Sequence, residues 1–245
     1  GAVVGALWAL GLRAASLPDG PTVSLLGADD AQLVLIDTTD TRTLALLGPV
    51  SGALAARIPA LLTPFRQRID LLIGDLPALA RVDPRTIPGS PHVLAVAGTP
   101  PREVPSMPDR TVVRTRAALR LGHTVRAELH AAPRGLWRSG TTPGDSDWRL
   151  EIRFRDDRLV MATSAIAATA APASPSVLVM PGDDPGLAAE ILRPGAIAVN
   201  ARAADAVPTD AWILRVFDDE IARLALLGSG VRLPAWARKG HSSDS

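Results

Sequence analysis

The stretch DLLIGDLPALAR, Asp70–Arg81, carries the clearest fold signal in this 245-residue chain. It begins within Ile69–Ile73, a short and mainly apolar run typical of a strand buried on both faces. A short helix or loop is expected over Leu76–Val82, and a second buried strand over His92–Ala97 (HVLAVA). Strand, crossover and strand in this order indicate layered α/β architecture.

The second half of the chain repeats this pattern with strands at Val177–Met180 and Ala196–Asn200 around a helix at Pro185–Leu192. Antiparallel strands are predicted before each unit, at residues 23–26, 31–37 and 42–47 and then at 112–129 and 148–161. We therefore predict an α/β fold, an αββα sandwich of two mixed β-sheets with outer helices. Residues 22–97 would form one sheet and residues 111–200 the other. A single helix with one apolar stripe is expected over 51–65, and Ser51 can cap its start. The remaining expectations are a linker over 165–176 and a last hairpin from 212–216 and 221–227.

Composition limits the classes of function. The chain has no cysteine, which excludes disulfides, cysteine-ligated zinc and thiol nucleophiles. Its net charge of +1 does not mark a polyanion binder. Arginines gather at Arg110, Arg114, Arg116 and Arg120 and again at Arg149, Arg153, Arg155 and Arg158. Because they alternate with apolar residues, as on the solvent face of a strand, DNA binding is possible but is not supported by charge.

The order of these elements resembles the C-terminal, metallo-β-lactamase-fold domain of the ComEC family of membrane DNA-uptake (competence) proteins. Six family phrases carry the resemblance. L-D-V-G-Q-G-D-A resembles Ser24–Ala31, T-L-L-I-D-G-G-P resembles Thr43–Pro49, and D-L-L-V-L-S-H-P-H-A-D-H resembles Asp70–Arg81. In the second half, N-D-N-S-L-V-L-R-L resembles Asp145–Ile152, L-L-T-G-D resembles Met161–Ser164, and V-L-K-V-P-H-H-G resembles Val177–Asp184. The resemblance runs from about residue 1 to about residue 235.

The family fold is that of a metal-dependent hydrolase, but the ligand residues are lost in this chain. The family's ligand positions are occupied by Leu76, Ala78, Ala80, Arg81, Ser164, Gly182 and Asp183. Leucine and alanine cannot ligate a metal, and an arginine would repel one. The resemblance thus implies a degenerate site with no catalytic residue, no metal and no cofactor. We expect the loops carrying these residues to meet at one edge of the sandwich, where Arg81 would pair with Asp75 or Asp183.

Four carboxylates, Asp29, Asp30, Asp183 and Asp184, lie near the position that the fold would use for a metal. As a relocated acidic cluster they could bind Mg²⁺ through oxygen ligands alone. Asp-rich turns are more common as helix caps, however, and Asp184 before Pro185 is a natural N-cap. The relocated cluster therefore stays the alternative to a silent site.

Three functions follow. The first is a non-catalytic, metallo-β-lactamase-like domain of a ComEC-type protein, with a structural or interaction role beside the membrane-channel part of the same polypeptide. The second is a metal-dependent nuclease or phosphodiesterase with relocated carboxylates, and the third an unrelated α/β binding protein. We expect residues 1–17 to be the tail of a transmembrane helix, 18–238 the domain and 239–245 a polar tail. The resemblance implies membrane attachment at the extracytoplasmic face.

Overall fold

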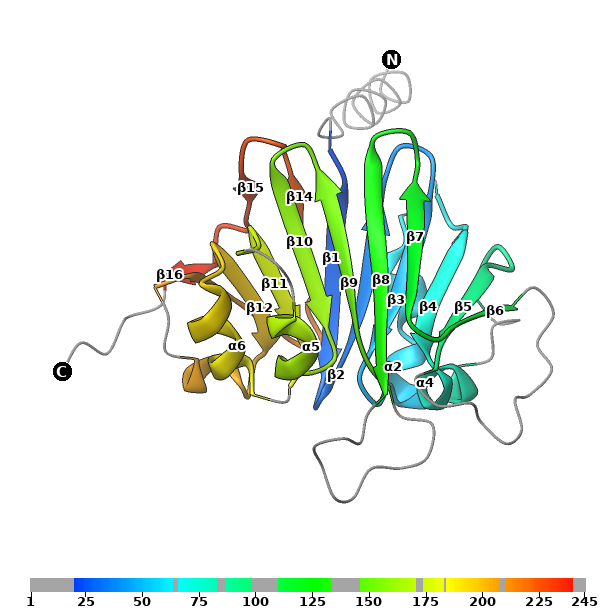
Figure 1. Cartoon of the computed structure of the whole chain (residues 1–245), viewed down its shortest axis with the longest axis horizontal. Coiled ribbons are helices and arrows are strands. Elements are labelled where there is room, and N and C mark those ends of the chain that lie inside the picture. The colour runs from blue at the N-terminus through cyan, green and yellow to red at the C-terminus, as the bar shows by residue number, and fades with distance from the viewer. Residues whose placement is uncertain are drawn as a thin grey trace, which may run out of the picture.

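Two mixed β-sheets pack face to face, with helices on the outside (Figure 1). The structure is a computed structural model that describes residues 20–63, 66–82, 87–97, 110–133, 146–170, 174–182, 184–207 and 210–239. The described residues form two eight-stranded sheets, in the orders β15-β14-β1-β2-β3-β4-β5-β6 and β16-β13-β12-β11-β10-β9-β8-β7. This architecture confirms the predicted sandwich.

The strands of the first sheet are β1 (Thr22–Ala28), β2 (Ala31–Asp37), β3 (Arg42–Leu47), β4 (Leu71–Asp75), β5 (His92–Val96), β6 (Arg110–Val113), β14 (Ala222–Leu226) and β15 (Val231–Arg232). Those of the second are β7 (Arg116–Leu121), β8 (Val125–Pro133), β9 (Ser146–Phe154), β10 (Asp157–Ala162), β11 (Val177–Met180), β12 (Ala196–Asn200), β13 (Trp212–Val216) and β16 (Arg238–Lys239). In the first sheet, β1 to β3 pair antiparallel and β3 to β6 pair parallel. In the second sheet, β7 to β10 pair antiparallel and β10 to β13 pair parallel.

The core has three layers. Between the sheets lies an apolar cluster in which Trp148 and Phe154 are the largest buried side chains. A second cluster fills the space between the first sheet and the helices α2 (Gly52–Ala55), α3 (Ile58–Leu61) and α4 (Leu76–Arg81). A third joins the second sheet to α5 (Ala165–Thr169), α6 (Pro185–Leu192) and the 3₁₀ turn η2 (Ala204–Ala206). Each sheet is therefore buried on both faces where helices cover it.

The sheet boundaries differ from the prediction. Strand β6 completes the first sheet by pairing parallel with β5, whereas β7 already belongs to the second. The expected hairpin of 212–216 and 221–227 is wrong, because β13 pairs with β12 and β14 crosses back to pair with β1. The chain thus closes the sandwich by returning its last strands to both sheets.

The helices also differ in part. Ser51 caps α2 by accepting a hydrogen bond from Leu54 N at 3.2 Å, as predicted, but the expected helix over 51–65 is split into α2 and α3. The predicted linker over 165–176 begins instead with α5, whose small face packs on β9 and β10. Alanines fit that close approach, so tertiary packing makes a helix of a segment whose composition suggested a linker.

Both sheets end their parallel strands at the same edge of the sandwich, where α4, α5 and α6 lie (lower edge of Figure 1). We call this the carboxyl edge, formed by the ends of β4, β10, β11, β12 and β13 and the β1–β2 turn. Among the described residues no helix is long and apolar enough to cross a membrane. The expected membrane tail over 1–17 and polar residues 240–245 lie outside the described residues, so the proposed domain division stays a prediction.

Candidate functional site

A buried polar bridge joins the two sheets at the carboxyl edge. Gln32 lies on the face of β2 that turns toward the second sheet, and Asn200 ends β12 on the face that turns toward the first. The Gln32 Nε2 atom donates a 2.7 Å hydrogen bond to Asn200 Oδ1 and contacts Met180 O at 3.5 Å. Both side chains are buried, at 0% and 4% exposure, so the bond replaces water for groups that are costly to leave unpaired.

Asn200 also fixes the β1–β2 turn. Its Nδ2 atom donates to the main-chain oxygen of Asp29 and, at 3.3 Å, to that of Ala31. Gly27 leaves the space for this side chain, because a Cβ atom there would lie 2.4 Å from Asn200 Oδ1. A glycine at this point of β1 is therefore required by close approach, and the amide holds the turn against the second sheet.

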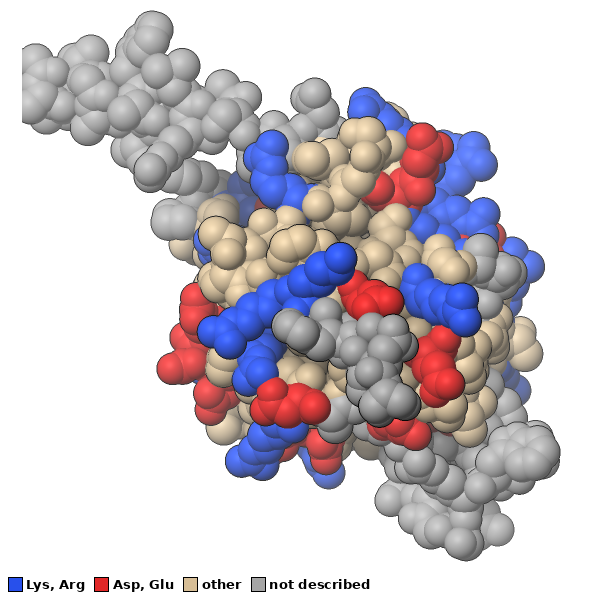
Figure 2. Space-filling view, turned by 90° about the vertical axis from the view of Figure 1, so that its left-hand side faces the viewer, with Lys and Arg blue, Asp and Glu red and all other residues tan. Residues whose placement is uncertain are grey.

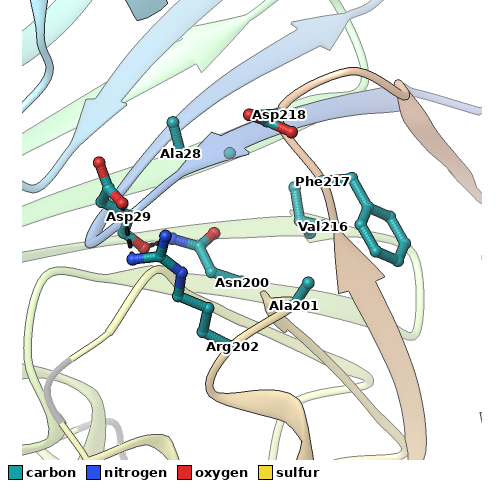
Figure 3. Close-up of a pocket in the computed structure, with 9 residues that line it drawn as sticks. Ala28, Asp29, Asn200, Ala201, Arg202, Val216, Phe217 and Asp218 are labelled. Atoms are coloured by element: carbon teal, nitrogen blue, oxygen red, sulfur yellow. Dashed lines mark hydrogen bonds and ion pairs between the residues drawn. The ribbon is translucent and has the colours of Figure 1, made fainter.

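A pocket of about 190 Å³ opens beside this bridge (Figure 3). It is lined by Gly27, Ala28, Asp29, Asn200, Ala201, Arg202, Val216, Phe217 and Asp218. Asp29 and Arg202 form a 2.9 Å ion pair at its mouth, with both side chains mostly exposed. Such exposed pairs contribute little to stability, so they can rearrange around a bound group. The pocket lies outside the carboxyl ends of parallel strands, where ligands bind in many α/β sheets.

A charged cluster around Glu151 lies on the outer face of the second sheet. Glu151 on β9 is 2% exposed and accepts hydrogen bonds or ion pairs from Arg153 at 2.7 Å and Arg158 at 2.8 Å. Burial raises the pKa of Glu151, but hydrogen bonds and attraction from Arg158 and Arg153 outweigh it, so the net pKa is lowered. Figure 2, which views the molecule from the side of β16 and α6, shows basic and acidic side chains interspersed rather than a field of one sign.

Comparisons with known proteins bear on the fold. No family model and no curated protein matches the chain. A mutant of the β-hydroxylase CmlA is 14% identical and aligns over 84% of this chain and 54% of its own, with a TM-score of 0.50. This chain therefore spans about half the length of that protein. Metallo-β-lactamases also match. MEM-A1, a subclass B3 enzyme isolated from a soil metagenome library, is 15% identical over 75% of this chain and 77% of its own, with a TM-score of 0.40. Rm3 is 14% identical over 75% and 76%, with a TM-score of 0.36.

The chain has a metallo-β-lactamase-like fold. Two mixed sheets, each antiparallel at one side and parallel at the other, with helices outside, are the arrangement that the ComEC resemblance implied. At these identities the likeness to solved structures establishes the fold alone. What this fold does here depends on the side chains at its carboxyl edge.

In this metallo-β-lactamase-like fold, the residues after β4 form α4. Asp75 caps that helix by accepting a 2.9 Å hydrogen bond from Ala78 N. Ala78 is buried at 1% exposure against the first sheet, whereas Ala80 and Arg81 are exposed. Arg81 is exposed and forms no ion pair with Asp75, and the other predicted partner, Asp183, lies outside the described residues, so the pairing of Arg81 stays a prediction. Leu76 packs as a partly buried member of the outer apolar cluster.

The predicted metal-ligand positions on the second sheet lie at a helix cap and beside the β1–β2 turn. Ser164 is 1% exposed and caps α5 by accepting a 3.2 Å hydrogen bond from Ala167 N. Gly182 follows β11 and lies against the β1–β2 turn, since a Cβ atom there would be 3.1 Å from Asp30 Oδ1. Asp183 lies outside the described residues. Helix α4 packs on β3, β4 and β5, and α5 packs on β9, β10 and α6. Contacts across the edge are made by the β1–β2 turn, with Asn200 and with Gly182.

The acidic residues of the proposed relocated cluster make different contacts. Asp184 caps α6 by accepting a 3.1 Å hydrogen bond from Leu187 N, as predicted, and Asp29 pairs with Arg202. Asp30 lies beside Gly182. Within the described ranges there is no group of three or more His, Cys, Asp or Glu side chains arranged to hold a metal ion.

Sequence reasoning missed Gln32 and Asn200. A signal was present, since each is the only amide in a largely apolar strand, AQLVLID and AIAVN. A polar residue within a buried strand needs a partner. The partner could not be named from sequence because the two residues lie 168 positions apart.

Proposed function

We propose that this chain is a non-catalytic, metallo-β-lactamase-like module of a ComEC-type membrane DNA-uptake protein, with a structural or interaction role. The fold and the ordered phrases from Ser24 to Asp184 support the proposal. Its partner would be the membrane-channel part of the same polypeptide, and it would be attached to the membrane at the extracytoplasmic face. The net charge of +1 does not support a role in binding DNA.

One observation carries the non-catalytic role. At three of the positions that the resemblance assigns to metal ligands, the side chain is engaged in packing or capping: Leu76 packs in the outer apolar cluster, Ala78 is buried in α4 and Ser164 caps α5. Metal-assisted hydrolysis needs imidazole or carboxylate groups that converge on an ion and lower the pKa of its bound water. Buried methyl groups cannot do this. A retained scaffold with changed ligand positions is what a module kept for contacts would have.

An apolar surface on α5 and α6 supports an interaction role. Ile166 is 51% exposed on α5, and Leu187 and Ile191 are 45% and 55% exposed on α6. The two helices contact each other (Figure 1), and Leu187 and Ile191 are four residues apart on one helix face. Large exposed aliphatic side chains on adjacent helices are typical of a surface that binds another protein.

The test is metal analysis of the purified protein, with thermal melting in excess Zn²⁺, Mn²⁺ or Mg²⁺. Structural zinc sites gain roughly 10–16 kcal/mol from their ligands, so loss of the ligands should leave no tight site. We expect no stoichiometric ion and no large rise in melting temperature with any of the three metals. A stoichiometric ion, or a rise of many degrees, would overturn the non-catalytic proposal.

The alternative function is a metal-dependent nuclease or phosphodiesterase with relocated carboxylates. The observation in its favour is the proximity of the Asp30 carboxylate to Gly182, which brings an acidic group to the β11 loop. Hydrolysis of bis(p-nitrophenyl) phosphate, measured with each metal, separates the two functions. Activity that is lost in Asp30→Asn but kept in Asp156→Asn, an exposed residue in the β9–β10 turn, would establish the alternative.

A further inference from the structure

A second and larger hollow, of about 400 Å³, lies on the outer face of the first sheet. We call it the β14 groove, and it is lined by Thr22, Ser24, Leu35, Asp37, Leu61, Thr63, Arg223, Leu224, Ala225, Arg232, Leu233 and Pro234. Helices α2 to α4 pack over β2 to β5, but no described helix continues over β14 and β15. The groove occupies this uncovered part of the sheet, between α3 and the chain after β15.

Strand alternation explains which side chains reach the groove. Val23 and Leu25 point into the core between the sheets, so Ser24 points outward. Ala222 and Leu224 likewise contribute to that core, which turns Arg223 outward. Arg232 is paired in register with Ala225, so it lies on the same face as Arg223. Two arginines therefore lie on adjacent strands beside one groove.

The floor and ends of the groove are apolar. Leu35 and Ala225 are buried side chains of the sheet, Leu61 is the last residue of α3, and Leu233 and Pro234 close the far side. A cavity of this size lies within the range of about 300–1,000 Å³ that is common for small-molecule sites. Such sites combine mostly apolar walls with a few polar groups that orient the ligand.

The charges of the groove favour an anion. Arg223 and Arg232 are exposed, and neither forms an ion pair with a described residue. Asp37 is the one carboxylate lining the groove, and it is already paired with Arg42 at 2.8 Å and Arg66 at 2.9 Å. The acidic group is thus neutralised within its own cluster, while two guanidinium groups remain available. Guanidinium binds carboxylate and phosphate through paired hydrogen bonds.

We propose that the β14 groove binds an amphipathic organic anion, an apolar chain ending in a carboxylate or phosphate. The chain would lie on Leu35, Leu61 and Ala225, and the anionic head would bind Arg223 and Arg232. The hydroxyl groups of Thr22 and Ser24, which line the same groove, supply further donors. This site is on the outer face of the first sheet and is separate from the carboxyl edge.

The experiment titrates the full chain with octanoate, octyl phosphate and the neutral 1-octanol. Calorimetry and the NMR chemical shifts of groove residues measure the binding of each. We expect both anions to bind and 1-octanol to bind at least about tenfold more weakly, because it lacks the charged head. Arg223→Gln combined with Arg232→Gln should weaken octanoate binding about tenfold or more and change 1-octanol binding less than about twofold.

The matched control is Arg120→Gln with Arg126→Gln, two exposed arginines on β7 and β8 of the other sheet. Thr63→Trp, at the exposed rim, should block all three ligands while leaving both arginines in place. Because Thr63 Oγ1 accepts a 3.1 Å hydrogen bond from Arg42, thermal melting checks that this variant is folded. Vesicles of phosphatidylcholine with and without phosphatidylglycerol distinguish a lipid headgroup from a free anion. Absence of binding by every anionic probe to the folded protein, equal binding of 1-octanol, or equal loss in the control variant would overturn the proposal.

Discussion

Gln32 and Asn200 form a 2.7 Å hydrogen bond across the interface between the two sheets, although 168 residues separate them in the chain. The bond is made at the carboxyl edge, where Asn200 also donates to the main chain of the β1–β2 turn. Each amide occupies a position that apolar residues fill elsewhere on its strand. The pair therefore sets how the β1–β2 turn and the end of β12 lie relative to each other.

The bridge predicts strong coupling in a double-mutant cycle. Gln32→Leu and Asn200→Leu should each lower the free energy of unfolding by about 1–3 kcal/mol, since each leaves a buried partner unsatisfied. The double variant should lose less than the sum, with a coupling energy of about 1 kcal/mol or more. Urea denaturation at neutral pH measures all four proteins. Strictly additive losses would mean that the two amides do not stabilise each other.

At the same edge, the backbone conformation at Gly48 requires a glycine. Its φ is +76°, and a Cβ atom there would lie 2.2 Å from the main-chain oxygen of Asp30. Gly48→Ala should lower the free energy of unfolding by about 2 kcal/mol or more, through the disfavoured φ and the clash with the turn. The matched control is Gly52→Ala at the start of α2, where a Cβ atom meets nothing within 4 Å. That change should be neutral or stabilising by about 0.4–1 kcal/mol, and an equal loss in both variants would contradict the assignment.

A histidine at one of the positions that the resemblance assigns to a metal ligand should harm the fold. Ala78 is 1% exposed, so Ala78→His forces a larger polar ring into a filled space and should cost about 2–4 kcal/mol of unfolding free energy. Ala80→His, on the exposed side of the same helix, should cost less than about 1 kcal/mol. Thermal and chemical denaturation give both values. If Ala78→His melts like Ala80→His, the α4 position is not the packed one described above.

Glu151 predicts an acid-dependent part of stability. Because its pKa is lowered in the folded protein, folding favours the ionised form, and the stabilisation is present above the ordinary value of 4.5. It is lost as the pH falls through the lower pKa of the folded state. Wild type should therefore lose more unfolding free energy than Glu151→Gln on acidification from pH 5 to pH 3. The control is the exposed Glu220→Gln, whose pH profile should follow wild type, and parallel profiles for all three would refute the prediction.

Local sequence patterns were sufficient to predict the elements that depend on residues close together in the chain. The apolar runs predicted at 69–73, 92–97, 177–180 and 196–200 form β4, β5, β11 and β12, because short apolar segments between turns are buried on both faces. Strand β4 lies two residues later than predicted, at Leu71–Asp75. The caps at Ser51 and Asp184 form as predicted, since an N-cap hydrogen bond joins residues three positions apart. The split of 51–65 into two short helices was not visible in its single apolar stripe.

Pairing over long distances was decided by the tertiary structure. Residues 222–226 alternate in a way that suits either sheet, and only the assembled sandwich shows that they pair with β1 rather than with the strand before them. The α5 segment is rich in small residues that suggested a linker, and it becomes a helix because β9, β10 and α6 give its alanines a surface to pack on.

The candidate site divides in the same way. The sequence by itself determined which side chains stand at the positions that the ComEC resemblance assigns to metal ligands, because the identity of a side chain sets whether it can ligate a metal: Leu76, Ala78, Ala80, Arg81, Ser164, Gly182 and Asp183. Only the tertiary structure decided that Asp75 and Ser164 cap helices, that Gln32 meets Asn200, and that Arg223 and Arg232 lie beside one groove. Those contacts depend on strand order and register, which bring together residues that no local pattern relates.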